Sequence, residues 1–330
     1  MKKISEAILG KISQNENLVR SLIEHRQDLL IEYAEQIART GEGSDMCLKK
    51  GFLPVLVHFY QPIPDIEDLE RRNVWERISE LPGISFIPQK YLKLMKRFGE
   101  KYSVECKWPN EPTKNPSDFY LNNNCFSYGC ASSLHCMIRE YKPRRIIEVG
   151  SGHSSKIIRE AIEKNKSENG IKVDYKIIDP YFSLEEKAFS SDTSIIRKKV
   201  ENVKPDIFKS LKENDILFID SSHVCKIGSD VNYEILEILP NLNKGVIVHF
   251  HDVSLPYEYS KTYATNPAFR MFWTEAYLLQ AFLAHNDYFE ILLPMTYLQR
   301  DHEEEYRKVF PFSRETQNFG SGSFWIRRVK

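Results

Sequence analysis

The stretch "RRIIEVGSGHSSKIIREAI" (residues 144–162) reads as a buried strand, a tight glycine turn and a helix. Gly150 and Gly152 permit the tight turn and let the backbone approach a ligand closely. Ser154 or Ser155 can cap the helix that follows. A strand, glycine turn and helix in this order commonly hold the polar part of a nucleotide-like ligand. The stretch therefore predicts such a ligand site at the end of this strand.

From residue 144 onward, apolar runs alternate with helical or loop stretches. The runs are "RIIEVG", "DYKIID", "DILFID" and "GVIVHFHD", and each ends in Gly or Asp. Continuous apolar strands that alternate with helices predict an α/β fold with a parallel sheet covered on both faces. Ligands of such sheets bind beyond the carboxyl ends of the strands. The acidic residues expected along this edge are Glu148, Asp179, Asp220 and Asp252.

The N-terminal part of the chain follows a different pattern. Residues 4–40 are predicted to be helical because their apolar residues recur at helical spacing, and this stripe is expected to pack against the rest of the protein or a second copy. "GEGSD" (41–45) ends the helix, and "FLPVLVHFYQPIPD" (52–65) is strand-like until two prolines stop it. We expect an N-terminal, mainly helical accessory region over residues 1–120 and a second domain over 121–330. The apolar stripe consists of Leu9, Ile12, Leu18, Leu22, Leu29, Leu30, Tyr33 and Ile37.

Composition narrows the classes of partner. Lys plus Arg and Asp plus Glu both number 46, so the net charge is zero and a nucleic-acid partner is not expected. No apolar run is long enough to span a bilayer, and the N-terminus lacks the apolar core of a signal peptide. The six cysteines form no CxxC pair and do not fit the usual spacings of a zinc site. Reduced thiols without an export signal predict a cytoplasmic protein.

The glycine turn departs from two common nucleotide-binding motifs. The dinucleotide fingerprint GxGxxG requires a third glycine, and Ser155 stands at that position. The chain also has no GKS or GKT of a phosphate-binding loop. Asp179 ends the next strand, where a carboxylate can accept hydrogen bonds from both ribose hydroxyls of a nucleoside. A nicotinamide-dependent oxidoreductase is therefore an alternative that Ser155 disfavours.

These motifs resemble those of the class I S-adenosylmethionine-dependent methyltransferases. "EVGSGHSS" is similar to their glycine-rich first motif, "IIDP" to the acidic second motif, and "DILFIDSSH" and "GVIVHFHDV" to their fourth and fifth strand ends. The resemblance covers about residues 125–330 and is closest to the branch of small-molecule and sugar O-methyltransferases. It implies a Rossmann-like, seven-stranded, mostly parallel sheet with an antiparallel last strand, in which "FEILLP" and "GSGSFWIRRV" supply the final hairpin.

The resemblance also implies that the cofactor is S-adenosylmethionine. The loop "KKVENV" (198–203) lies where that family has the loop after its third strand. From the residues alone, a structural role for Glu148 as a cap of neighbouring backbone is as well supported as a cofactor contact. The predicted cofactor contacts are Glu148, Gly150, Ser151 and Gly152 around the methionine part, Asp179 at the ribose, and Glu201 and Asn202 at the adenine.

A divalent cation is a further implication of the resemblance. In metal-dependent O-methyltransferases, carboxylates at the fourth and fifth strand ends bind a cation that lowers the pKa of the substrate hydroxyl. Asp220 and Asp252 are the predicted ligands here, and oxygen ligands favour Mg²⁺ or Mn²⁺. His223 is the predicted base, and His251 is an additional ligand or base. The acceptor would be a hydroxyl of a sugar, a glycan or another small molecule.

Other interpretations of these residues remain open at this point. Asp220 can instead cap a helix or hold the cofactor amino group. His249 shares a strand face with His251, and a buried structural histidine is the favoured interpretation for it. "HFHD" can also belong to an iron site with two histidines and one carboxylate, which the glycine turn disfavours. A non-catalytic adenosylmethionine-binding protein is a third function, and the N-terminal helices could form a homo-oligomer.

Overall fold

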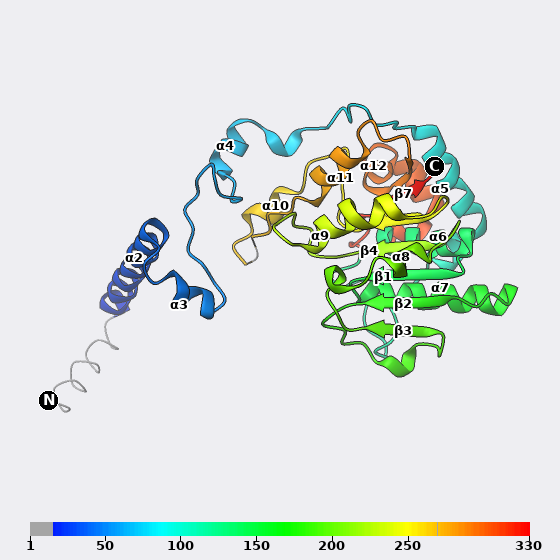
Figure 1. Ribbon diagram of the computed structural model, residues 1–330, viewed down its shortest axis with the longest axis horizontal. Helices are drawn as coiled ribbons and strands as arrows, with labels where there is room; N and C mark the ends of the chain where they lie inside the picture. Colours follow the sequence, from blue (N-terminus) through cyan, green and yellow to red (C-terminus); the bar gives the residue numbers. More distant parts are fainter. Residues whose placement is uncertain (1–15, 269) are drawn as a thin grey trace. The chain divides into compact units, whose positions relative to one another are not determined.

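The computed structural model describes residues 16–268 and 270–330 (Figure 1). It divides into two compact units, of which the first ends at Arg72 and the second spans Asn73–Lys330. Among the described residues, none of the helices combines the length and the apolar character needed to cross a bilayer. All six cysteines are free thiols, of which Cys125 and Cys225 are exposed and the other four are buried. The cytoplasmic location stays a prediction.

The first unit contains the expected long helix. This helix, α2, spans Glu16–Thr40, and the glycines of "GEGSD" end it, since Gly41 has a φ of 76° that other residues rarely adopt. The predicted start of the helix, with Leu9 and Ile12, lies outside the described residues. The segment 52–65 forms no strand in the described part of the chain, because Pro54 and the two later prolines cannot donate to a sheet ladder. The other helices of this unit are α3 (Ser44–Lys49) and α4 (Ile66–Arg71).

The apolar stripe of α2 is mostly uncovered. Leu29, Leu30 and Tyr33 have exposed fractions of 51%, 67% and 53%, whereas Ile37 is buried. The expected packing of the stripe is therefore present only at Ile37 within the described residues. A homo-oligomer through these helices stays a prediction.

The second unit is built on a seven-stranded sheet in the order β3-β2-β1-β4-β5-β7-β6. Strands β1 to β5 pair in parallel, and β7 runs antiparallel between β5 and β6. This confirms the Rossmann-like α/β fold with an antiparallel last strand. The strands are β1 (Arg145–Val149), β2 (Asp174–Ile178), β3 (Thr193–Ile196), β4 (Ile216–Ile219), β5 (Ile247–Phe250), β6 (Phe289–Pro294) and β7 (Phe324–Arg328).

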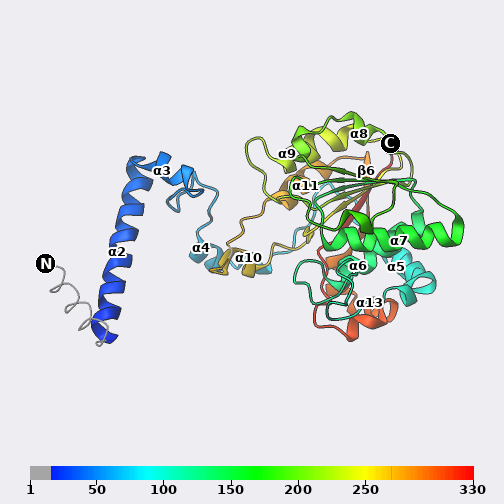
Figure 2. The same ribbon diagram turned by 90° about the horizontal axis from the view of Figure 1, so that it is seen from below.

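Helices cover both faces of the sheet, so its central strands are mostly apolar, with buried Glu148 on β1 and His249 on β5 as exceptions. Figure 2 shows α5, α6, α7 and α13 on one face and α8 and α9 on the other. The α-helices are α5 (Pro88–Lys101), α6 (Tyr128–Tyr141), α7 (His153–Asn169), α8 (Asp206–Lys209), α9 (Asp230–Tyr233), α10 (Lys261–Thr265), α11 (Glu275–Leu283), α12 (Met295–Asp301) and α13 (Glu303–Val309). Short turns are η1 (Val74–Glu76), η2 (Ser103–Glu105), η3 (Glu186–Ala188), η4 (Val200–Asn202), the π-helical η5 (Glu234–Ile238), η6 (Leu239–Asn241) and η7 (Pro311–Arg314).

The boundary between the units lies earlier than residue 120, where the sequence placed it. Helix α5 buries one apolar face, including Met95 (1% exposed) and Phe98 (0%), in the same hydrophobic core as the sheet. Phe119, 3% exposed, joins this core from the loop that follows. Burial of this apolar surface is what makes residues 73–120 part of the sheet domain.

A buried ionic network also ties this segment to the sheet domain. Glu105 accepts hydrogen bonds from Arg139 Nε at 2.8 Å and Arg139 Nη2 at 3.1 Å, and His135 Nε2 lies 2.7 Å from the same carboxylate. The Arg139 side chain is only 4% exposed. Burial raises the pKa of Glu105, but the hydrogen bonds from His135 and Arg139 lower it to about 2. The folded protein therefore favours the ionised form of Glu105.

We expect Glu105→Gln to lower the free energy of unfolding at pH 7 by about 3 kcal/mol, because the folded state prefers the charged carboxylate. A carboxyl group with a lowered folded pKa contributes stability above its unfolded pKa of about 4.5, and this contribution is lost as the pH falls toward 2. In urea unfolding, the difference between the wild type and the variant should shrink over that range. Glu100→Gln, exposed on α5, is the matched control. A difference that does not change with pH would contradict the assignment.

Candidate active site

The glycine turn lies directly against the end of strand β4. Gly150 has a φ of 81°, and a Cβ atom added to it would lie 1.9 Å from the carbonyl oxygen of Asp220. Backbone hydrogen bonds fix this approach: Gly150 N donates to Ile178 O at 3.0 Å and Asp220 N donates to Val149 O at 2.9 Å. Only glycine fits here. The turn after β1 and the residue after β4 therefore form one edge.

Glu148 lies beneath this turn and is fully buried. Its carboxylate accepts hydrogen bonds from Ser154 Oγ at 2.7 Å, from Ser155 Oγ at 2.9 Å and from the hydroxyl of Tyr175. Burial raises its pKa to about 7, although these three hydrogen bonds oppose the shift. Ser155 Oγ also accepts the N–H of Gly152 at 3.1 Å, which caps the start of α7. In the structure Glu148 thus holds the start of α7, and its predicted contact with a cofactor stays a prediction.

An open cleft of about 510 Å³ lies beyond the carboxyl ends of β1, β2 and β4. Of the predicted cofactor contacts, Gly150, Asp179 and Glu201 line it. The lining does not include the other four, Glu148, Ser151, Gly152 and Asn202. Asp179 accepts hydrogen bonds from Ser151 N at 3.0 Å, from Ser151 Oγ and from Tyr181 N at 2.7 Å. The carboxylate is thereby fixed at the wall of the cleft.

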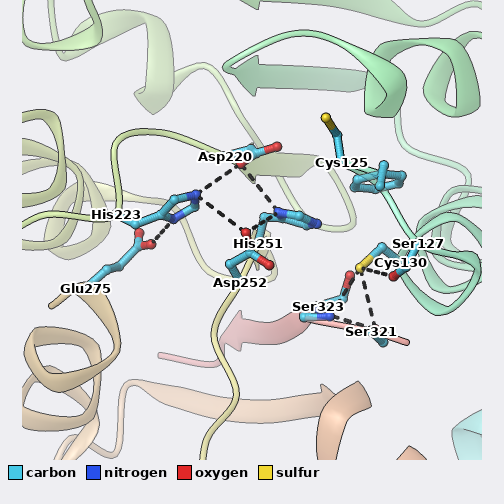
Figure 3. A network of polar contacts seen from close by, with 12 residues as sticks. Cys125, Ser127, Cys130, Asp220, His223, His251, Asp252, Glu275, Ser321 and Ser323 are labelled. Carbon is cyan, nitrogen blue, oxygen red and sulfur yellow. Dashed lines mark hydrogen bonds and ion pairs between the residues drawn. The ribbon is translucent and has the colours of Figure 1, made fainter. Parts of the chain in front are cut away.

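The other two strand ends bring four polar side chains together (Figure 3). Asp220 Oδ1 lies 3.4 Å from His223 Nε2 and 3.5 Å from His251 Nδ1. Asp252 Oδ2 lies 3.9 Å from His223 Nε2 and 3.3 Å from His251 Nδ1. Two carboxylates and two imidazoles therefore alternate around one centre. We call Asp220, His223, His251 and Asp252 the edge cluster.

Three side chains of the edge cluster, Asp220, His223 and His251, have strongly shifted pKa values. Burial opposes charge on Asp220, but the two imidazoles hold its pKa well below its usual range. In the same way, burial lowers the pKa of His223, but hydrogen bonds to Asp220 and Glu275 raise it to about 10. Asp252 and Asp220 raise the pKa of His251 despite its burial. Two neighbouring carboxylates repel unless positive charge lies between them, and the two imidazoles supply that charge here.

Two histidines on β5 and its end have different surroundings. His249 is fully buried, stacks on Phe218 with ring centroids 4.2 Å apart, and lies with Nε2 2.9 Å from Ser323 Oγ. These contacts agree with the structural role favoured from the sequence. His251 turns Nδ1 into the edge cluster and stacks on Phe126 at 5.0 Å.

The structure adds residues to this edge that sequence reasoning did not select. Burial raises the pKa of the Cys130 thiol, but the charge of His251 and hydrogen bonds from Ser127 and Gly322 N lower it to about 7. Glu275, at the start of α11, places Oε2 2.8 Å from His223 Nδ1. A lone acid before the apolar run "AYLLQAFL" was the available signal for Glu275. Cys130 had no such signal, because it is one of several thiols in an apolar helix.

Comparisons with known proteins identify proteins that are similar to this chain. A family model described as "Methyltransferase domain" matches residues 147–253, which include every predicted site residue. A protein of Archaeoglobus fulgidus, named "Uncharacterized protein", is 32% identical over 186 residues, 53% of this chain and 80% of that protein. The solved structure "CmcI-N160 apo-structure" is 14% identical, with a TM-score of 0.36, over 68% of this chain and 90% of that one. SAH-bound Podospora anserina methyltransferase PaMTH1 is 15% identical, with a TM-score of 0.34, over 84% and 100%. With TM-scores this low, the two structures support no inference about this chain.

We expect Gly150→Ala to lower the free energy of unfolding by at least about 3 kcal/mol, because the new Cβ would meet the Asp220 carbonyl at a positive φ. Gly152→Ala is the matched control, since nothing lies within 4 Å of a Cβ added there. It should cost less than about 1 kcal/mol. Both values are measured by denaturant unfolding. Equal losses in the two variants would show that the contact with Asp220 is not the constraint.

Proposed function

Because the chain belongs to the class I S-adenosylmethionine-dependent methyltransferases, we propose that it methylates a hydroxyl group with the help of a divalent cation. The proposed acceptor is a sugar, a glycan or another small molecule. The proposal rests on the edge cluster, which lies next to the cofactor cleft. Asp220 belongs to the cluster, and the next two residues, Ser221 and Ser222, line the cleft. A methyl donor and an activated hydroxyl would meet at this boundary.

The cleft fits the proposed cofactor. Its volume of about 510 Å³ lies in the range of small-molecule sites, and Gly150 and Asp179 line its wall. A carboxylate can accept about four hydrogen bonds, and Asp179 accepts three from Ser151 and Tyr181, so it retains capacity for about one more, from a ribose hydroxyl. When bound, S-adenosylmethionine supplies the electrophilic methyl group. Gly150, Ser151, Gly152 and Asp179 are the proposed contacts, with Glu201 and Asn202 at the adenine.

The donor set of the edge cluster fits a cation. The ligand atoms of Asp220, His223 and His251 all lie within 4.8 Å of one another, and Asp252 faces the same centre. We propose Asp220 and Asp252 as the ligands of Mg²⁺ or Mn²⁺, with His251 as an additional ligand. Such a cation, when bound, lowers the pKa of an acceptor hydroxyl.

The protein's own groups would then orient the acceptor and remove its proton. His223 Nε2 points into the cluster. A cation held by Asp220 and Asp252 would supply the positive charge that the imidazolium supplies without it, so His223 could then be neutral and act as the proposed base that takes the proton of a hydroxyl. His251 Nδ1 faces the same centre, and His251 is the second proposed catalytic group as the alternative to its role as a ligand. Fixed charges and short distances would supply most of the acceleration, since transfer to a sulfonium methyl mainly needs alignment.

Two other functions are less well supported. An NAD(P)-dependent oxidoreductase would use the third glycine of its fingerprint, whereas Ser155 caps α7 and bonds to Glu148. A non-catalytic adenosylmethionine-binding protein has no need for four charged side chains held at the edge. Burying charged groups costs free energy, so their presence at this edge favours a functional role.

S-adenosylmethionine should bind and raise the melting temperature, and NADH should not. Asp179→Ala should weaken binding at least about tenfold, because hydrogen bonds from the ribose to a charged group contribute about 1.5–3 kcal/mol. Isothermal titration calorimetry measures both affinities. Glu237→Ala, exposed on the helical segment after α9, is the control. Binding of NADH without binding of S-adenosylmethionine would defeat the proposed function.

Methyl transfer should stop in a chelator and return with Mg²⁺ or Mn²⁺, because the cation supplies the acidity that a sugar hydroxyl lacks near neutral pH. The assay follows radiolabelled methyl transfer to a panel of free and nucleotide-linked monosaccharides. Asp252→Asn should weaken cation binding while the affinity for S-adenosylmethionine stays near that of the wild type, since Asp252 does not line the cleft. Full activity in chelator would exclude the cation and leave His223 or His251 as a metal-free base.

A further inference from the structure

We propose that Glu275 is the positioning residue that turns Nε2 of His223 into the edge cluster. The inference rests on the proposed function, because it gives the base of that reaction its orientation. Glu275 lies on the first turn of α11, far from His223 in the sequence. Figure 3 shows its carboxylate behind the imidazole, on the side away from Asp220 and Asp252.

The side-chain contact decides which ring nitrogen faces the edge cluster. Glu275 Oε2 lies 2.8 Å from His223 Nδ1, and the two side chains are only 1% and 9% exposed. In its ionised form the Glu275 carboxylate can only accept, and Nδ1 then carries the proton of this bond. Nε2 is then the nitrogen left to face Asp220 Oδ1 at 3.4 Å and Asp252 Oδ2 at 3.9 Å. Orientation of an imidazole by a buried carboxylate is a known requirement of histidine bases.

The start of α11 also holds the backbone of His223. The carbonyl oxygen of His223 accepts hydrogen bonds from Thr274 N at 2.9 Å and Glu275 N at 3.1 Å. Two residues on, Cys225 N donates to Thr274 Oγ1 at 2.7 Å. His223 has a φ of 60°, a conformation that is uncommon for residues other than glycine. Trp273 packs on the ring, with centroids 4.6 Å apart.

A purely structural clamp does not explain the carboxylate. The backbone bonds already fix the loop, and a buried acid is expensive where a neutral side chain would serve. The second oxygen, Glu275 Oε1, has no hydrogen-bond partner in the described part of the chain. The one hydrogen bond of the Glu275 carboxylate among the described residues is therefore the bond with Nδ1 of His223. The choice of this residue type makes sense if the orientation of the imidazole matters for the reaction.

The test compares wild type, Glu275→Gln and Glu290→Gln by NMR of protein labelled with ¹⁵N-histidine. The spectra are recorded over a pH titration that passes the pKa of His223, and His223→Asn assigns the signal. In the wild type, the neutral ring should carry its proton on Nδ1. In Glu275→Gln, the carboxamide is a weaker, uncharged acceptor and can also donate to Nδ1, so the share of neutral rings with the proton on Nδ1 should fall. Glu290 bonds to Arg327 on the outer hairpin, and Glu290→Gln should leave the pattern unchanged.

Function and fold are measured on the same proteins. Glu275→Gln should keep the melting temperature and the calorimetric affinity for S-adenosylmethionine, while kcat on the monosaccharide panel falls about a hundredfold with little change in KM. If Glu275→Gln unfolds, Glu275→Asp replaces it, and the wild-type spectrum alone still decides the orientation. A wild-type proton on Nε2, or an unchanged pattern in Glu275→Gln, overturns the inference. Failure to bind S-adenosylmethionine would instead defeat the proposed function and leave the spectrum of His223 interpretable.

Discussion

The close approach of Gly150 to the carbonyl oxygen of Asp220 is the constraint on which this edge depends. Parallel pairing of β1 with β4 brings their carboxyl ends together, and the absence of a side chain at Gly150 lets the turn lie against the neighbouring strand end. The cofactor cleft and the edge cluster therefore share a wall. A larger residue at this one position would separate the two sites or distort both.

A second glycine sets the other side of the edge cluster. A Cβ added to Gly322 would lie 2.7 Å from Asp252 Oδ1, and Val253 N donates to Gly322 O at 3.0 Å. Gly322 precedes β7, the antiparallel strand, so the insertion of β7 beside β5 fixes where Asp252 can point. Gly322 N also donates to Cys130 Sγ at 3.2 Å. The hairpin at the end of the chain is thus part of the site and not only an edge of the sheet.

Charge in the edge cluster is balanced within a buried setting. His223 and His251 place positive charge between Asp220 and Asp252, and each imidazole has further support behind it, Glu275 for His223 and the Cys130 sulfur near His251. Groups of this kind are costly to bury unless each has a partner. Their concentration at the carboxyl ends of β4 and β5, and not elsewhere along those strands, is typical of a site that performs chemistry.

The sequence alone determined the alternation of strands and helices, the glycine turn and the acids at the strand ends, because each is a local pattern read over a few residues. Parallel pairing of β4 with β5 then brings the segments of Asp220, His223, His251 and Asp252 to one edge of the sheet. Only the tertiary structure decided that Glu275, 52 residues from His223, supports its ring, and that residues 73–120 belong to the sheet domain. It also turned Glu148 under the turn, toward Tyr175. These outcomes depend on how the helices pack on the sheet. That packing is set jointly by side-chain volumes at positions far apart in the sequence.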